Sequence, residues 1–403
     1  MMIPSETHIS WFSEQWKWTS AEMPLFSNEY SPAEKLLREK KSTAFYSRFK
    51  SLGEEVRKGK REFDDQAVIP ELSRFMTDVY DFPGCTAELV VNPEFFGVSR
   101  LFYRQAKEFD SGLQREEIYQ AMRNLWIMNG IQMMMGLPVE LTPAMFAYSL
   151  LYPYSDNLLD DPELSKSDKL MFSWRFEDRL RGIQVPARDH REQKISELVG
   201  MIEQQFSREE YPEVYESLLA IHAAQTRSIV LQNQGSDLGP EEILKVCFAK
   251  GGASVLADGF LVAPMLTPLQ QRFLYGYGIW LQLADDIQDI ADDEKEQVRT
   301  LFSGAESKEE VAGFLNRTIH FGRAIIHDIG CFPSPLCSGF GSIMVHSIEM
   351  MILQSAALNQ SYFPNSQLGQ LERYSPQRFA YLRELKKKGS SRRMGLITSL
   401  AAG

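Results

Sequence analysis

The sequence predicts an all-α protein, and three observations support this prediction. From residue 96 to about residue 390, apolar residues recur mostly at three and four positions, which is the period of an amphipathic helix. Extended alternation of apolar and polar residues, the pattern of a half-buried strand, is missing from this stretch. Proline occupies the first turn of several expected helices, as in Thr142-Pro143, Gly239-Pro240 and Thr267-Pro268, where its fixed backbone angle suits a helix start.

The chain divides into three expected parts. Residues 1–95 form an N-terminal extension with two or three short helices, and Pro93 suggests the boundary near residue 95. The extension carries a tryptophan cluster for which packing against the main body is favoured over a ligand lid: Trp11, Trp16 and Trp18. Residues 96–390 form a helical domain, and residues 391–403 form a flexible tail. The helices expected in the domain span 97–109, 114–135, 142–160, 166–181, 190–206, 211–233, 240–263, 267–292, 307–328, 340–355 and 376–388.

Composition and charge exclude several classes of protein. Lys+Arg number 43 against 54 Asp+Glu, a net charge of −11, so nucleic acid is not an expected partner. The 4 cysteines form no CxxC pair, which favours reduced, buried thiols over a disulfide framework. The first residues lack the basic and apolar pattern of a secretory signal, and no run of about 18 apolar residues occurs. We therefore expect a cytoplasmic protein with no transmembrane segment, and peripheral contact with a membrane stays open.

Two expected helices carry aspartates where an amphipathic pattern does not need them. Asp156 and Asp160 stand four residues apart, and Asp285, Asp289 and Asp293 form a stripe along one helix face. Like charges at this spacing repel each other, so a divalent cation would stabilise such helices. Carboxylates without histidine or thiolate favour Mg²⁺ or Mn²⁺ over Zn²⁺, and Mg²⁺ commonly shares its coordination with substrate phosphates. The pattern indicates a diphosphate ligand, and a solvated acidic face is the alternative.

Both motifs resemble the aspartate-rich motifs of class I isoprenoid synthases. The segment from Asp156 to Asp160 is similar to the DxxxD of squalene and phytoene synthases, and LQLADDIQD at 281–289 resembles the FQxxDDxxD of trans-prenyl diphosphate synthases. The stretch 245–265, with small residues at 251–254, is similar to the kinked helix of the bacterial large terpene synthases of class IB. Those enzymes usually have an aspartate where this chain has Leu159.

The resemblance implies a helical bundle with a central active-site cavity. It also implies a Mg²⁺-dependent terpene synthase, with Mn²⁺ as the alternative ion, that converts a polyprenyl diphosphate into a linear or cyclic terpene and diphosphate. A prenyltransferase of the squalene/phytoene or chain-elongating type and a non-catalytic helical relative are the alternatives, and a homodimer is an option. The expected metal ligands are Asp156, Asp160, Asp285, Asp289 and Asp293, with Asp286 less favoured.

Basic side chains are expected to bind the leaving diphosphate, because developing negative charge needs neutralisation. Arg227 is preferred and is counted with Asp156, Asp160 and Asp289 as catalytic, since it interrupts an apolar helix and should have a buried partner. The other candidates for substrate binding are Arg175, Arg179, Lys250 and Gln225. Surface ion pairs are the alternative role for each of the basic residues.

Aromatic side chains are expected to face the carbocation left after ionisation, since cation–π contact stabilises it. Tyr152, Phe260 and Tyr277 are the candidates, and a place in the hydrophobic core is the alternative for each. The Gly251-Gly252 pair has two interpretations: relaxation of the helix toward the cavity, or close packing against a neighbouring helix.

Overall fold

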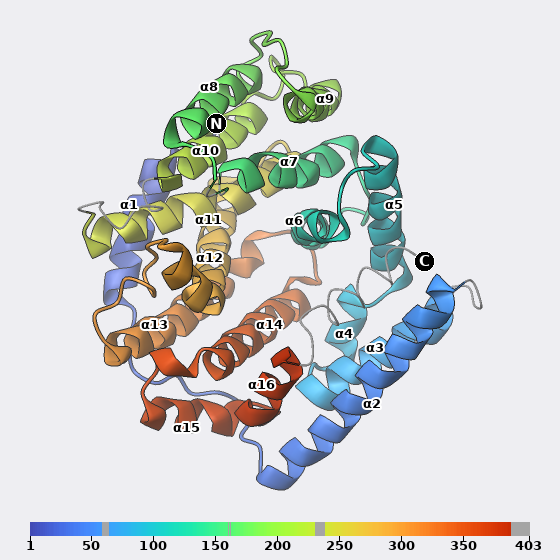
Figure 1. Ribbon diagram of the computed structural model, residues 1–403, viewed down its shortest axis with the longest axis vertical. Coiled ribbons are helices and arrows are strands. Elements are labelled where there is room, and N and C mark those ends of the chain that lie inside the picture. Colours follow the sequence, from blue (N-terminus) through green and yellow to red (C-terminus); the bar gives the residue numbers. More distant parts are fainter. Residues whose placement is uncertain (59–63, 160, 162, 230–237, 388–403) are drawn as a thin grey trace.

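The computed structural model describes residues 1–403 except 59–63, 160, 162, 230–237 and 388–403 (Figure 1). The described residues form helices and no strands, which confirms the all-α prediction. The first half contains α1 (Ser5–Trp18), α2 (Pro32–Arg57), α3 (Asp65–Tyr80), α4 (Gly84–Val90), α5 (Pro93–Phe109), α6 (Arg115–Met135), α7 (Pro143–Leu159), α8 (Lys166–Leu180) and α9 (His190–Gln205). The second half contains α10 (Pro212–Ser228), α11 (Pro240–Val262), α12 (Pro268–Glu296), α13 (Lys308–Ile326), η2 (His327–Cys331), α14 (Cys337–Leu358), η3 (Gln360–Tyr362), α15 (Asn365–Tyr374) and α16 (Phe379–Lys387).

Local sequence signals set the ends of the helices that carry the motifs. Thr267 caps α12 by accepting a hydrogen bond from the backbone N–H of Gln270, whose side chain bonds back to Thr267, and Pro268 fills the first helical position. Gly136 ends α6 in the left-handed conformation, at φ 71°, which glycine adopts without strain. These signals explain why the expected helix starts at 142, 240 and 267 agree with the structure to within one residue.

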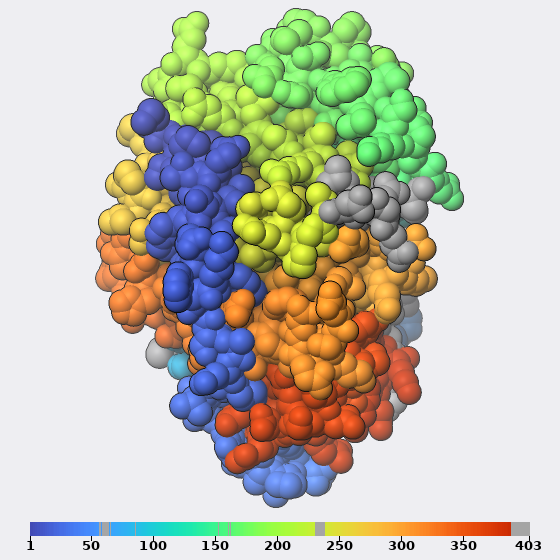
Figure 2. All heavy atoms as spheres, turned by 90° about the vertical axis from the view of Figure 1, so that its left-hand side faces the viewer, coloured from blue at the N-terminus to red at the C-terminus, as the bar shows by residue number. Residues whose placement is uncertain are grey.

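The N-terminal extension differs from the expectation. It contains four helices, α1 to α4, and α2 alone runs for 26 residues. Phe12 and Trp16 of α1 are buried in the same cluster as Phe102 and Trp280, so one hydrophobic core extends across the boundary predicted near residue 95. Figure 2 shows the N-terminal segment, in blue, running along one face of the molecule beside residues of α11 and α13. The tail predicted at 391–403 lies outside the described residues.

The predicted tryptophan cluster is divided between core and surface. Trp16 packs edge-on against Phe248 and Phe321, as expected for packing against the main body. Trp18 is largely exposed, and Trp11 lies beneath the guanidinium of Arg272, 4.2 Å from its ring centroid. Only one of the three rings therefore belongs to the core of the described residues.

Glycines bring α11 and α12 into close contact. A Cβ atom added at Gly251 would lie 2.5 Å from the carbonyl oxygen of Gly278, and one at Gly252 would overlap the ring of Tyr275. The helix α11 runs unbroken through both glycines. Close packing is therefore the interpretation that the structure supports for the Gly251-Gly252 pair.

The helix α14 is the one element in the described part of the chain that is long and apolar enough to cross a membrane. Its apolar window is 56% buried inside the molecule, where α14 packs against α4, α12 and α16 (Figure 1). A core helix satisfies the same test of length and composition. Cys247 and Cys337 are buried free thiols, Cys331 is a partly buried one, and the side chain of Cys85 is outside the description.

Candidate functional site

A cavity of about 760 Å³ lies among α6, α11, α12 and α14, and α3, α4 and α5 close it on the N-terminal side. Its walls are mostly apolar and include Phe95, Phe96, Trp126, Phe340, Met344 and Met351. Facing turns of two helices contribute the charged and amide side chains of its lining: Gln120, Arg123 and Asn124 of α6, and Gln282 and Asp285 of α12. Arg123 Nη2 lies 3.3 Å from Asp285 Oδ1, and both side chains are partly exposed, so this polar end is the mouth.

The second aspartate motif begins at this mouth and continues along α12. Asp286 is buried and accepts a hydrogen bond from the Cys247 thiol of α11 at 3.3 Å and another from Gln282 Nε2, one turn earlier on α12, at 2.8 Å. Burial, followed by repulsion from neighbouring aspartates, raises the pKa of Asp286 to about 7, of Asp289 to about 6 and of Asp293 to about 8. The positive charge of Lys250 lowers the pKa of Asp286 and partly offsets this rise.

This donor set fits a divalent cation in its chemistry. Several carboxylates are held in partly dry surroundings against their mutual repulsion, and carboxylate oxygens are the ligands that Mg²⁺ prefers. The structure does not gather them into one coordination shell: within the described ranges, no group of three or more His, Cys, Asp or Glu side chains lies close enough to hold an ion. The predicted aspartates therefore lie along α12, but their carboxylates are not arranged as a coordination shell.

A second, smaller space lies next to the first aspartate motif, and Ser155 and Gln225, the neighbour and the hydrogen-bond partner of Asp156, line it. Asp156 is only 2% exposed and accepts a hydrogen bond from Gln225 Nε2 at 2.5 Å, so the structure joins two predicted site residues. Its helix α7 lines a cavity of about 40 Å³ together with α8 and α10. Asn124 and Ser254 line both cavities, so the two spaces are adjacent. Asp160 lies outside the described residues.

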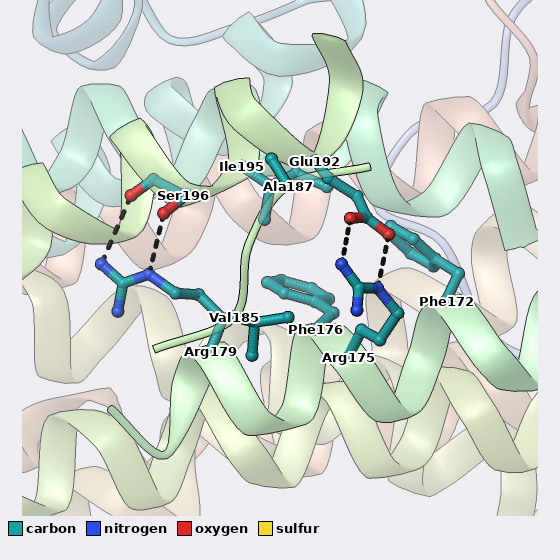
Figure 3. Close-up of a pocket in the computed structure, with 9 residues that line it drawn as sticks. All are labelled: Phe172, Arg175, Phe176, Arg179, Val185, Ala187, Glu192, Ile195 and Ser196. Carbon is teal, nitrogen blue, oxygen red and sulfur yellow. Dashed lines mark hydrogen bonds and ion pairs between the residues drawn. The ribbon is translucent and has the colours of Figure 1, made fainter. Parts of the chain in front are cut away.

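Two of the predicted diphosphate ligands are engaged elsewhere (Figure 3). Arg175 makes a two-pronged ion pair with Glu192, with N–O distances of 2.9 and 2.6 Å. Arg179 pairs with Glu203 at 2.7 Å and donates to Ser196 Oγ at 3.1 Å. The pocket between the two guanidiniums measures about 20 Å³, which is room for roughly one water molecule. In this arrangement carboxylates of α9 pair with both guanidiniums, and binding of diphosphate by them stays a prediction.

The expected buried partner of Arg227 is also wrong. Arg227 Nη2 lies 3.3 Å from Glu242 Oε2, and the two side chains are 52% and 42% exposed. The reason is its position, since α10 ends at Ser228 and its last turn stands at the surface. The structure thus assigns Arg227 the alternative role, a surface ion pair.

The three aromatic candidates lie in different surroundings. Tyr277 lines the large cavity, whereas Phe260 is buried in the core cluster, and the side chain of Tyr152 is outside the description. The other rings in the described lining, such as Trp126 and Phe340, were missed because no motif marks them.

Sequence reasoning also missed polar residues of the site. Arg123 and Asn124 were detectable, because they interrupt the apolar pattern of the helix predicted at 114–135. Asp258 also interrupts an apolar helix, but it is not among the residues that line either cavity. Its side chain is fully buried, neither carboxyl oxygen has a hydrogen-bond partner in the described structure, and burial raises its pKa well above the usual range.

Comparisons of the chain with protein-family models, with curated proteins and with solved structures find no match. The function of the protein is therefore inferred from the aspartate motifs and from the cavities beside them.

Proposed function

We propose that the protein is a Mg²⁺-dependent class I terpene synthase, with Mn²⁺ as the alternative ion. It ionises a polyprenyl diphosphate and releases diphosphate and a linear or cyclic terpene. The observation that carries the proposal is the cavity of about 760 Å³, whose walls are apolar and whose mouth holds Asp285 of the second motif. This volume lies within the range of about 300–1,000 Å³ typical of small-molecule sites.

The residues of this chain divide the work between the mouth and the walls. Asp285, Asp289 and Asp293, with Asp156 and Asp160 of the first motif, would hold the metal, which when bound neutralises charge on the leaving diphosphate. Arg123 and Lys250 add positive charge beside the second motif. A Lys or Arg at this place favours departure of the diphosphate, because negative charge develops on the diphosphate as the carbon–oxygen bond breaks.

The walls bind the hydrocarbon chain and exclude water. Rings of Trp126, Tyr277 and Phe340 line the cavity. A desolvated cation is stabilised by about 2 kcal/mol when it contacts an aromatic face, so these rings would stabilise the carbocation after ionisation.

We place this activity in the cytoplasm. The support is the state of the described cysteines, Cys247, Cys331 and Cys337, which are free thiols as expected in a reducing compartment. We also propose peripheral contact between the protein and a membrane, because a polyprenyl substrate is hydrophobic.

The test is a product assay with purified protein, Mg²⁺ and single C15, C20, C25 or C35 diphosphates, alone and with isopentenyl diphosphate. We expect a terpene from one substrate alone, and loss of the product with EDTA. Asp289→Asn should lower the rate at least about 100-fold, because each metal ligand contributes several kcal/mol to charge stabilisation. Asp292→Asn, at an exposed position on the same helix, is the matched control and should remain active.

Two outcomes contradict the proposal. A product that forms only when a second isoprenoid substrate is present would make the protein a prenyltransferase. No product from any combination would favour the non-catalytic relative.

A further inference from the structure

One end of the molecule exposes a surface without charged side chains. Three segments form it: residues 135–139 after α6, 262–269 from the end of α11 to the first turn of α12, and 332–336 before α14. None of these 18 residues is charged, whereas 24% of the whole chain is. Eight of them are exposed apolar or proline residues: Leu137, Pro138, Met265, Pro268, Leu269, Pro333, Pro335 and Leu336. We call this surface the apolar end.

Hydrogen bonds show that the three segments lie beside one another. The side-chain nitrogen of Gln270, next to the second segment, is 3.7 Å from Met135 Sδ and 3.4 Å from the carbonyl oxygen of Cys331. The backbone N–H of Ser334 donates to the carbonyl oxygen of Met134 at 3.2 Å. The apolar end is therefore one continuous surface built from segments far apart in the sequence.

The apolar end lies opposite the mouth of the large cavity. Met134, which directly precedes the first segment, lines the cavity at the end away from Arg123. Leu269 and Asp285 are 16 residues apart on α12, which at 1.5 Å per residue is about 24 Å. A partner bound at the apolar end would therefore leave the second aspartate motif facing water.

The size of the apolar end favours a lipid bilayer over a protein partner. Met265 is 84% exposed and Leu269 is 60% exposed, and removing such side chains from water is favourable. A stable protein interface takes about 20–30 residues from each partner, far more than the eight that are exposed here. A bilayer requires no matching surface and accepts short apolar segments.

A tryptophan and an arginine stand at the edge of the apolar end. Arg272 follows Leu269 by three residues on α12, and its guanidinium lies 4.2 Å from the ring centroid of Trp11, which is 40% exposed. Asp328 pairs with Arg272 at 3.3 Å. Tryptophan is enriched at the level of lipid headgroups, and arginine extends its charge there from an apolar stem. The order from apolar tip to ring to charge is that of a membrane interface.

We propose that the apolar end inserts into one leaflet of a lipid bilayer, with Trp11 and Arg272 at the level of the headgroups. This inference rests on the membrane contact of the proposed function and not on its reaction. The ligand is the acyl region of the bilayer and not an anionic headgroup, because the three segments carry no basic side chain.

Flotation of the full chain with phosphatidylcholine vesicles tests the inference. We expect the protein to float with these neutral vesicles and to stay bound when KCl is added, because salt screens charges and does not weaken apolar burial. Hydrogen–deuterium exchange locates the contact without any variant. With vesicles present, exchange should slow in residues 262–269 and 332–336.

Variants test the same surface. Met265→Glu combined with Leu269→Glu should lower partitioning into the vesicles at least about tenfold, because both side chains lose their favourable transfer from water. Glutamate suits the first turn of α12, so the helix should still form. Leu37→Glu is the matched control, since Leu37 is 56% exposed on α2, and it should leave partitioning unchanged. Thermal unfolding followed by circular dichroism checks that all variants fold.

Several outcomes would overturn the inference. Binding only to vesicles that contain phosphatidylserine, and its loss in KCl, would show electrostatic attachment through another surface. Absence of vesicle binding, or unchanged exchange in the three segments, would exclude insertion. A concentration-dependent dimer that the double variant disrupts would assign the apolar end to a second copy of the chain.

The proposed reaction is tested separately by the product assay, which needs no vesicles. A protein that binds vesicles through the apolar end and forms no terpene would overturn the reaction alone. A protein that forms a terpene and does not bind vesicles would overturn the membrane inference alone.

Discussion

Protonation of the buried side chain of His8 should lower the stability of the fold. His8 is 2% exposed and stacks on the ring of Tyr275, with ring centroids 4.5 Å apart. Burial, with the nearby charge of Arg272, lowers its pKa from 6.5 to about 4. The side chain is therefore neutral in the folded protein at a pH where the unfolded chain already binds a proton.

Stability should consequently fall as the pH drops from about 6.5 to about 4. The unfolded state binds more protons than the folded state in this window, so the free energy of unfolding rises with pH. At pH 4.5 the loss attributable to His8 is roughly 2 kcal/mol, since one pKa unit corresponds to about 1.4 kcal/mol. Urea denaturation at pH 7 and 4.5 measures it.

The variant His8→Phe keeps the stacking ring and removes the titrating group. Its free energy of unfolding should decline less than that of the unmodified protein over the same pH interval. Equal declines in the two proteins would show that other groups cause the acid sensitivity.

Residue identity also shows how far a site can be anticipated from sequence. Asp156 and Gln225 were predicted for one site and do form a hydrogen bond. Arg175 and Arg227 were predicted for the same site and pair instead with Glu192 and Glu242. A basic residue pairs with the carboxylate that the fold brings near it. Tertiary packing determines which carboxylate that is, and the spacing of residues along one helix does not.

At the scale of elements, the contact between α11 and α12 depends on the absence of side chains. Gly252→Ala should lower the free energy of unfolding by about 1–3 kcal/mol or more, because the added Cβ overlaps the ring of Tyr275. Thermal unfolding followed by circular dichroism measures the change.

Gly369 provides the matched control for this substitution. It also lies in a helix, α15, and a Cβ added there meets nothing within 4 Å. Gly369→Ala should be neutral or stabilising by up to about 1 kcal/mol, because alanine is the better helix former. Similar losses at both positions would contradict the steric explanation.

Helix starts were predicted well where a proline and a regular apolar stripe occur together. The starts of α11 and α12 follow from Pro240 and Pro268. The helix α2 also begins at a proline, Pro32, and Ser31 caps it by accepting a hydrogen bond from the backbone N–H of Glu34. It was not predicted as one long helix because it has no single apolar stripe, since lysine, arginine and glutamate recur throughout its 26 residues. Tertiary packing maintains it, including a small cluster of Phe49 with Val68 of α3.

At the scale of the whole molecule, metal binding should stabilise the fold. Mg²⁺ should raise the melting temperature, because an ion that binds only the folded state adds about 2.7 kcal/mol at 100 times its Kd. The increase should be largely lost in Asp289→Asn. Differential scanning fluorimetry with MgCl₂, against KCl at equal ionic strength, measures it.

The exposed neighbour Asp292 again supplies the control. Asp292→Asn should retain most of the increase in melting temperature that Mg²⁺ causes. An equal effect of Mg²⁺ on all three proteins would place the ion away from α12.

The large cavity was expected only through the resemblance, since its walls join residues from α3 to α14 that no local sequence pattern relates.

The same distribution of wall residues affects how the protein is made. The lining begins at Leu72 and is complete only at Met351, so most of the chain must leave the ribosome before its apolar inner surface is enclosed. At about 5–20 residues per second, nascent chains would carry this surface uncovered for tens of seconds. Chains that terminate before α14 would retain it permanently, which makes them clients for chaperones and substrates for quality-control proteases.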